Sequence, residues 1–126
     1  MLETIDVMRM ATAMAQHAGY RQSATAENIA HADTPGYRAK DASPFSTEAR
    51  TDFNAKQTRA THLAATDVTA FETQADESSP IAANGNSVSL EREMLRTVEI
   101  RQQHDTALAV YRSSLGILRT SLGRGR

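Results

Sequence analysis

The tetrapeptide Thr34-Pro35-Gly36-Tyr37 constrains the fold of this chain more than any other stretch of its sequence. Residues 1–33 contain no proline and consist largely of good helix formers such as Ala, Met, Gln and Glu. Because Pro35 disfavours the α conformation at Thr34, a helix in this region must end there or just before. Proline followed by glycine is typical of a type II turn, with a positive φ at Gly36. The sequence therefore predicts a long first helix followed by a sharp change in chain direction.

The N-terminal segment, residues 1–33, has the periodicity of an amphipathic helix. Its apolar residues recur at intervals of three and four, and they are Ile5, Val7, Met8, Ala11, Met14, Ala15 and Ala18. We expect this helix to continue to about Ala32. The methionines are interpreted as packing against another helix, because their neighbours are alanines, although methionines also form adaptable surfaces for partners.

The C-terminal segment, residues 88–126, has the pattern of a second long helix. Ser89 is a candidate N-cap, and Glu91 and Glu93 follow in the first turn, where the helix dipole favours acidic side chains. Large apolar residues recur at threes and fours, as in the seam of a coiled coil; they are Met94, Val98, Leu108, Tyr111, Leu115, Leu118 and Leu122. Gly123 is expected to end this helix.

Between the helices, residues 34–87 comprise the turn and a segment of different composition. Residues 42–87 are rich in Thr, Ser, Ala, Asp and Glu, with three basic and six acidic residues. The large apolar residues here are Phe45, Phe53, Leu63, Val68, Phe71 and Ile81. Burying these few side chains does not offset the conformational entropy of ordering so long a segment. We expect it to be irregular, extended or mobile in the free monomer, with a short helix around residues 67–75 as an alternative.

Helices at the two ends of a chain most simply form an antiparallel pair. The sequence thus predicts an all-α fold, in which two long terminal helices pair as an antiparallel coiled coil beside an irregular middle segment. Two helices cannot cover both apolar stripes completely, so hydrophobic surface is left for neighbours, as in an assembly protein. The side chains interpreted as helix-packing or subunit contacts are Ile5, Met8, Met14, Val98, Leu108, Tyr111, Leu115, Leu118 and Leu122.

Composition argues against several classes of function. The net charge of −1 provides no basic excess for nucleic acid or an anionic membrane, and the absence of cysteine removes disulfides and thiolate chemistry. No apolar run approaches the ~20 residues of a membrane span, and the acidic N-terminus is unlike a cleavable secretory signal.

The histidines and acidic residues form no convincing catalytic or metal-binding pattern. His31 and Asp33 are a weak candidate pair of metal ligands, because no further ligand follows at suitable spacing. The remaining histidines, His17, His62 and His104, are expected at the surface. No Ser/His/Asp arrangement suggests a hydrolase. We therefore expect no metal, cofactor, small-molecule substrate or enzymatic activity.

Two stretches of the sequence resemble the flagellar rod and hook protein family. The first is similar to the Asn-Ile-Ala-Asn-x-x-Thr-Pro-Gly-Tyr pattern at the end of that family's N-terminal helix, and it matches at Asn28, Ile29, Ala30, Thr34, Pro35, Gly36 and Tyr37. His31 departs from the pattern, where the family usually has Asn. The second is similar to the Gly-Asn-x-Val-Asp-Leu-Glu-x-Glu-Met element of proximal-rod subunits, and it matches at Gly85, Asn86, Val88, Leu90, Glu91, Glu93 and Met94. Ser89 replaces the usual Asp.

This resemblance implies a structural subunit of the proximal rod. Such subunits self-assemble through their terminal helices into a hollow helical shaft, which transmits torque from the membrane ring to the hook. The resemblance also implies passage through the flagellar type III export apparatus without a cleaved signal and a place in the periplasm. Implied partners are further copies, other rod proteins, the membrane-ring protein and the rod-base adaptor. Within the signature, Asn28 and Tyr37 are expected to contact other subunits.

A soluble helical adaptor or export chaperone that binds one partner protein is the alternative. It would share the amphipathic terminal helices, but it has no need of the turn signature.

Overall fold

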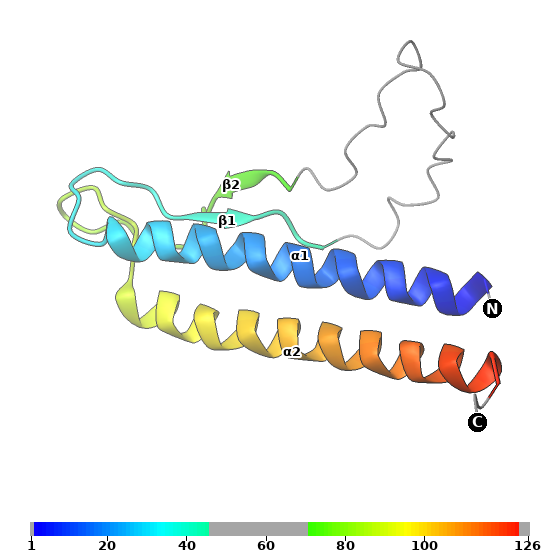
Figure 1. Cartoon of the computed structure of the whole chain (residues 1–126). Helices are drawn as coiled ribbons and strands as arrows, with labels where there is room; N and C mark the ends of the chain where they lie inside the picture. Colours follow the sequence, from blue (N-terminus) through cyan, green and yellow to red (C-terminus); the bar gives the residue numbers. More distant parts are fainter. Residues whose placement is uncertain (1, 46–70, 124–126) are drawn as a thin grey trace, which may run out of the picture.

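A computed structural model shows two long helices side by side in antiparallel orientation, with both chain termini at the same end (Figure 1). The structure describes residues 2–45 and 71–123. In chain order the elements are α1 (Leu2–Ala30), β1 (Lys40–Ala42), β2 (Thr73–Ala75) and α2 (Leu90–Ser121). The predicted all-α fold with two paired terminal helices is confirmed. Over these described ranges, neither helix has a stretch long and apolar enough to cross a membrane.

The end of α1 follows the local sequence closely. The helix ends at Ala30, two residues before the predicted end. In the tetrapeptide that follows, the N–H of Tyr37 donates to the carbonyl of Thr34 at 3.3 Å, and the φ of Gly36 is 74°. The predicted turn, with its positive φ at the glycine, is confirmed.

The start of α2 is placed as predicted, but its first turn is stabilised differently. Ser89 occupies the N-cap position, with φ −112° and ψ 118°. Its hydroxyl donates to Glu91 Oε2 at 2.9 Å and makes no capping bond to a helix N–H within the described chain. The expectation that Ser89 caps the helix through its side chain is therefore wrong. At the other end, Gly123 follows the helix with φ 96°.

The helices pack along a seam of buried residues that recur every seventh position, and most of these residues are small. On α2 the buried residues are Glu93, Ile100, Ala107 and Ser114. The corresponding face of α1 buries Ala11, Ala18 and Thr25, flanked by His17, Ala24 and Asn28. Small side chains at such positions let the two backbones approach closely, so the seam is narrow.

The predicted seam of large apolar residues on α2 is wrong in phase. Leu108, Leu115 and Leu118 are half-buried at the edges of the helix pair. Met94 and Val98 are 58% and 65% exposed. Ile5, Tyr111 and Leu122 are exposed as well, whereas Met8 and Met14 are half-buried. Large side chains lie outside because the close contact is taken by Ala107 and Ser114.

A two-stranded antiparallel β-ribbon, made of β1 and β2, runs along α1 (Figure 1). Its register pairs Lys40 with Ala75 and Ala42 with Thr73. The prediction of an irregular middle segment missed this ribbon, and the alternative helix around residues 67–75 is wrong at 73–75, which are β2. Residues 67–70 lie outside the described part of the chain.

An aromatic contact fastens the ribbon to α1. His17 is only 4% exposed, and its Nε2 donates to the carbonyl of Ser43 at 2.8 Å. The ring of His17 lies 5.5 Å from that of Phe45 and 5.0 Å from that of Phe71, centroid to centroid. The expectation that His17 lies at the surface is therefore wrong, because the ribbon covers it. His104 is half-buried, and His62 lies outside the described residues.

Candidate functional site: a polar junction at one end of the helix pair

The two signature segments come together at the end of the helix pair away from the termini. We call the contact between residues 28–41 and 84–96, with Arg21 and Asp76, the polar junction. The N–H of Gly36 donates to the carbonyl of Asn84 at 3.0 Å, and the N–H of Ser87 donates to the carbonyl of Tyr37 at 3.0 Å. A Cβ atom on Gly85, whose φ is 80°, would lie 3.4 Å from the Cα of Gly36. The positive φ values of Gly36 and Gly85, 74° and 80°, favour glycine at both positions, where the two segments meet.

Asn86 holds the turn that follows α1. Its side chain is buried, and its Nδ2 lies 3.0, 2.8 and 2.9 Å from the carbonyl oxygens of His31, Ala32 and Thr34. The two N–H groups of the amide are shared among these three acceptors. The amide oxygen accepts the N–H of Val88 at 2.7 Å. One side chain of the second signature thus fixes the backbone of the first.

Asn28 joins three segments of the chain. Its side chain is fully buried, and its Oδ1 accepts the N–H of Lys40 at 2.9 Å. Its Nδ2 donates to the carbonyl of Lys40 at 2.8 Å and to Glu93 Oε2 at 3.2 Å. The hydroxyl of Tyr37 donates to Asn28 Oδ1 at 3.4 Å. The prediction that Asn28 contacts another subunit is wrong, because its polar atoms are satisfied within the chain.

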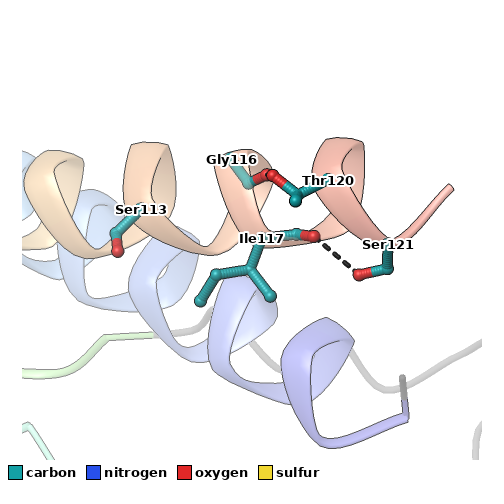
Figure 2. Close-up of a pocket in the computed structure, with 5 residues that line it drawn as sticks. All are labelled: Ser113, Gly116, Ile117, Thr120 and Ser121. Atoms are coloured by element: carbon teal, nitrogen blue, oxygen red, sulfur yellow. Dashed lines mark hydrogen bonds between the residues drawn. The ribbon is translucent and has the colours of Figure 1, made fainter. Parts of the chain in front are cut away.

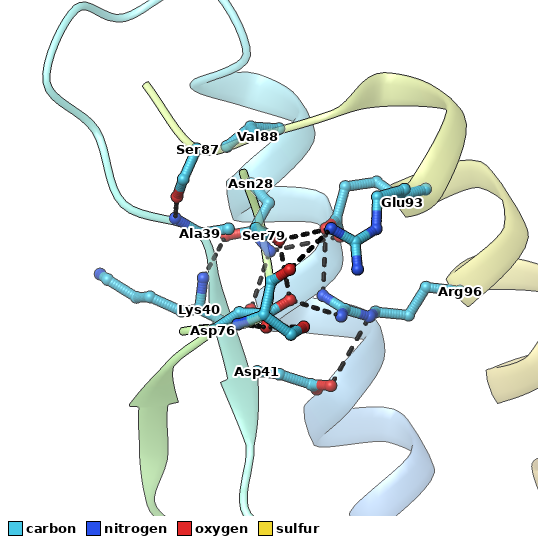
Figure 3. Close-up of polar contacts among 12 residues, drawn as sticks. Asn28, Ala39, Lys40, Asp41, Asp76, Ser79, Ser87, Val88, Glu93 and Arg96 are labelled. Carbon is cyan, nitrogen blue, oxygen red and sulfur yellow. Dashed lines mark hydrogen bonds and ion pairs between the residues drawn. The ribbon is translucent and has the colours of Figure 1, made fainter. Parts of the chain in front are cut away.

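A row of charged side chains continues from Asn28 across the junction (Figure 3). The guanidinium of Arg96 lies 3.1 Å from Glu93 Oε1, 2.7 Å from Asp76 Oδ2 and 3.6 Å from Asp41 Oδ2. Arg21 donates two hydrogen bonds to Asp41, at 3.1 and 3.0 Å. Positive and negative groups alternate, so each guanidinium lies beside carboxylates. This row connects α1, β1, the residue after β2, and α2.

The electrostatics of the row favour fully charged partners. Burial alone would raise the pKa of Asp76, but hydrogen bonds from Arg96, Ser78 and Ser79 outweigh it and hold that pKa well below its usual value. Burial likewise opposes the charge on Arg96, but the bond to Asp76 and the charges of Glu93 and Asp41 raise its pKa. Groups that stay charged at neutral pH serve as ion pairs rather than as proton donors and acceptors.

The weak candidate metal pair has a structural explanation. The ring of His31 stacks on that of Tyr37 at 4.6 Å, and its Nδ1 lies 3.2 Å from Thr34 Oγ1. Asp33 is exposed. Among residues 2–45 and 71–123, no three His, Cys, Asp or Glu side chains gather in a way that would hold a metal ion.

Sequence reasoning missed the charged row. The sequence predicts Glu93 to be an acid of the first helical turn, yet its side chain is 2% exposed and bonded to Asn28 and Arg96. The spacing of Glu93 and Arg96, three residues apart on one helix, was the available signal. Asp41 and Asp76 carry no such signal in the sequence, because each lies in a polar stretch far along the chain from the arginine that it contacts.

The polar junction is built from the two stretches that carry the resemblance, so they form one structural unit. No protein-family model matches the chain. It is 33% identical to the flagellar basal body rod protein FlgB of Agrobacterium fabrum (strain C58 / ATCC 33970), over an alignment of 123 residues that covers 89% of each chain. On that similarity, the chain belongs to the FlgB family of flagellar basal body rod proteins.

Proposed function

We propose that the chain is a self-assembling subunit of the proximal rod, in which copies of the helix pair stack into a hollow helical shaft that transmits torque from the membrane ring to the hook. Membership of the family makes the chain a structural component of the flagellar rod, and that family is not one of enzymes. The stacking of copies is our inference from the surface of the helix pair, whereas the hollow shaft and the transmission of torque are what the resemblance to the rod and hook protein family implies.

The observation that carries this proposal is the amount of large apolar side chain left outside the helix pair. Both helices contribute, and the exposed residues are Ile5, Val7, Met10 and Ile29 on α1, and Leu90, Met94, Leu95, Val98, Val110, Tyr111 and Ile117 on α2, with Leu122 just beyond it. Apolar surface distributed along both helices is typical of a protein whose neighbours complete its core. A monomeric adaptor needs one such patch for its partner.

The polar junction gives each copy a fixed shape before its neighbours arrive. Buried polar networks bond only in one arrangement, so they define the crossing of the helices and the path of the turn. In this proposal, residues 1–33 and 88–126 supply the subunit contacts, and residues 34–87 connect and brace them. Ile5, Met94, Val98, Tyr111 and Leu122 are the exposed side chains for which we retain a role in subunit contacts.

The location and partners follow from the same proposal. A place in the basal body is given by the family, and we infer that the chain acts in the periplasm after passing through the flagellar export apparatus without losing a signal peptide. Its partners there would be other copies and other rod proteins, with the membrane-ring protein and the rod-base adaptor as candidates at the base.

The test is a strain that lacks this chain. We expect its basal bodies to stop at the membrane ring and the cells to be non-motile, with both defects reversed by the wild-type chain, which should then copurify with the basal bodies. Complete rods in the deletion strain, with the chain confined to the cytoplasmic fraction of the wild type, would instead support an adaptor or chaperone.

A further inference from the structure

The surface of α2 differs between its two ends. Near the polar junction it carries a bulky patch, which we define as Leu90, Met94, Leu95 and Val98, and these side chains are 43%, 58%, 67% and 65% exposed. Towards the C-terminus it carries a groove lined by Ser113, Gly116, Thr120 and Ser121 together with the exposed Ile117, and we call it the small-residue groove (Figure 2). Bulky side chains at one end thus correspond to a hollow at the other.

The groove is suited to apolar side chains. It is a shallow groove that is open to solvent, with a volume of about 480 Å³. The hydroxyl of Thr120 donates to the carbonyl of Gly116 at 2.9 Å, and that of Ser121 donates to the carbonyl of Ile117 at 2.6 Å. Because these hydroxyls are bonded to their own helix, the groove presents mainly carbon atoms to a partner.

The charges on α2 differ between the two features. Residues 106–123 contain no acidic residue and two arginines, Arg112 and Arg119, both exposed. The bulky patch is flanked by the exposed acids Glu91 and Glu99. The two arginines nearest to it are already engaged, since Arg92 donates to Ser78 and Ser79 and Arg96 lies in the polar junction.

We propose that the bulky patch of one copy docks into the small-residue groove of the next copy, with their α2 helices parallel. This inference rests on the proposed rod function and specifies the contact between successive copies. The centres of patch and groove, Met94 and Gly116 to Ile117, are about 23 residues apart, so successive copies would be displaced by ~35 Å along the helix. Because patch and groove are different surfaces, each docked copy leaves one of each open, and the assembly can continue.

Cysteine cross-linking tests this contact in assembled rods. The natural chain has no cysteine, so a Leu95→Cys/Gly116→Cys chain has reactive thiols only at the patch and the groove. We expect a short bis-maleimide, applied to basal bodies purified from cells that make this variant, to yield dimers, trimers and longer covalent multimers. Either single variant, and the matched Ile81→Cys/Gly116→Cys pair, should yield none.

The pattern of products decides between arrangements. Dimers without trimers would indicate a closed antiparallel pair and overturn the head-to-tail proposal. No products beyond those of the controls, from a variant that is present in the rods of motile cells, would overturn the docking itself while leaving the rod function intact. A wild-type chain absent from purified basal bodies would instead refute the rod function.

A second variant separates docking from folding. Gly116→Leu fills the groove, yet a Cβ there meets no atom within 4 Å in the described structure, and leucine favours helix more than glycine. Gly116→Ala, which also replaces the glycine by a better helix former but adds only a Cβ to the groove, is the matched control. We expect Gly116→Leu to reduce incorporation into rods about ten-fold or more and Gly116→Ala to leave it nearly unchanged. Equal incorporation of the two variants would contradict the proposal.

Discussion

At the scale of single residues, the side chains of two asparagines hydrogen-bond segments that are distant in the sequence. Asn28 bonds the edge of β1 and the carboxylate of Glu93, while Asn86 bonds the turn after α1. Amides suit these positions because one side chain both donates and accepts, so it can serve the N–H and carbonyl groups of an irregular backbone. Each amide lies in one of the two signature segments, and the function of each is internal to the chain.

Replacing Asn28 should therefore reduce stability. In Asn28→Ala the N–H and carbonyl of Lys40 lose their side-chain partner, and so does one oxygen of the buried Glu93. We expect a loss of roughly 2–3 kcal/mol in the free energy of unfolding, since unsatisfied buried groups carry most of that cost. Urea unfolding followed by circular dichroism measures it. The exposed Gln22→Ala on the same helix is the control, and an equal effect of the two would contradict the assigned role.

Thr25 offers the opposite prediction. Its side chain is 1% exposed, and its hydroxyl has no hydrogen-bond partner within residues 2–45 and 71–123. Thr25→Val keeps the shape and removes the unsatisfied group, so we expect stabilisation of about 1 kcal/mol. The same substitution at the exposed Thr12, whose hydroxyl bonds the carbonyl of Met8, should have little effect. A less stable Thr25→Val chain would show that the hydroxyl has a partner.

At the scale of elements, the charged row holds the β-ribbon and the helices together. Arg96 is the common partner of Glu93, Asp76 and Asp41. Glu93 lies in α2, Asp41 lies in β1, and Asp76 directly follows β2. A guanidinium suits this place because its planar fork of donors can reach several carboxylates at once. Its loss would leave the buried Glu93 without a cationic partner.

The Arg96→Ala variant should consequently be strongly destabilised. Removing one member of a buried ion pair typically costs roughly 3–5 kcal/mol, and Arg101→Ala, an exposed site on the same helix, should cost far less. Thermal unfolding of the two variants and the wild type measures the difference. Similar losses in the two variants would mean that the charged row adds little to the fold.

The pH dependence of stability should report on Asp76. Its pKa is lowered in the folded chain, so its contribution is complete above the ordinary value of 3.8 and is lost as the pH falls from there towards the folded value. We expect Asp76→Asn to be less stable than the wild type at pH 7 and to lose less stability between pH 5 and pH 3. Urea midpoints at these pH values test this, with the exposed Glu77→Gln as control. Parallel curves for Asp76→Asn and the wild type would contradict the assignment.

The two helices and the turn were predictable because their signals are local. Pro35 and Gly36 specify the turn whatever surrounds it, and two long stretches of good helix formers without proline predict the helices. The β-ribbon could not be predicted from the sequence, because each strand has only three residues and pairs with a strand far away along the chain. The seam does not follow the pattern of large apolar residues, because most of its members are small or polar and many of the large residues face outwards.

At the scale of the whole molecule, polar contacts fix the conformation at one end of the helix pair, while the long flanks expose apolar surface. The polar junction fixes how the helices cross and where the turn lies, and it consumes most of the buried polar groups of the described chain. The long flanks of the helix pair have few buried polar residues among those described, and they expose large apolar side chains. A subunit of this kind keeps its own shape and depends on neighbours to cover its surface, which is what a structural component of the rod requires.

The most direct test is a cryo-electron microscopy map of the basal body at side-chain resolution. We expect the proximal rod to contain this chain as an antiparallel helix pair, with Asn86 against the turn after α1, Arg96 between Glu93 and Asp76, and the exposed apolar residues of both helices covered by neighbouring copies. A map in which the two helices of one chain are separated, or in which their apolar faces remain uncovered in the rod, would contradict the account.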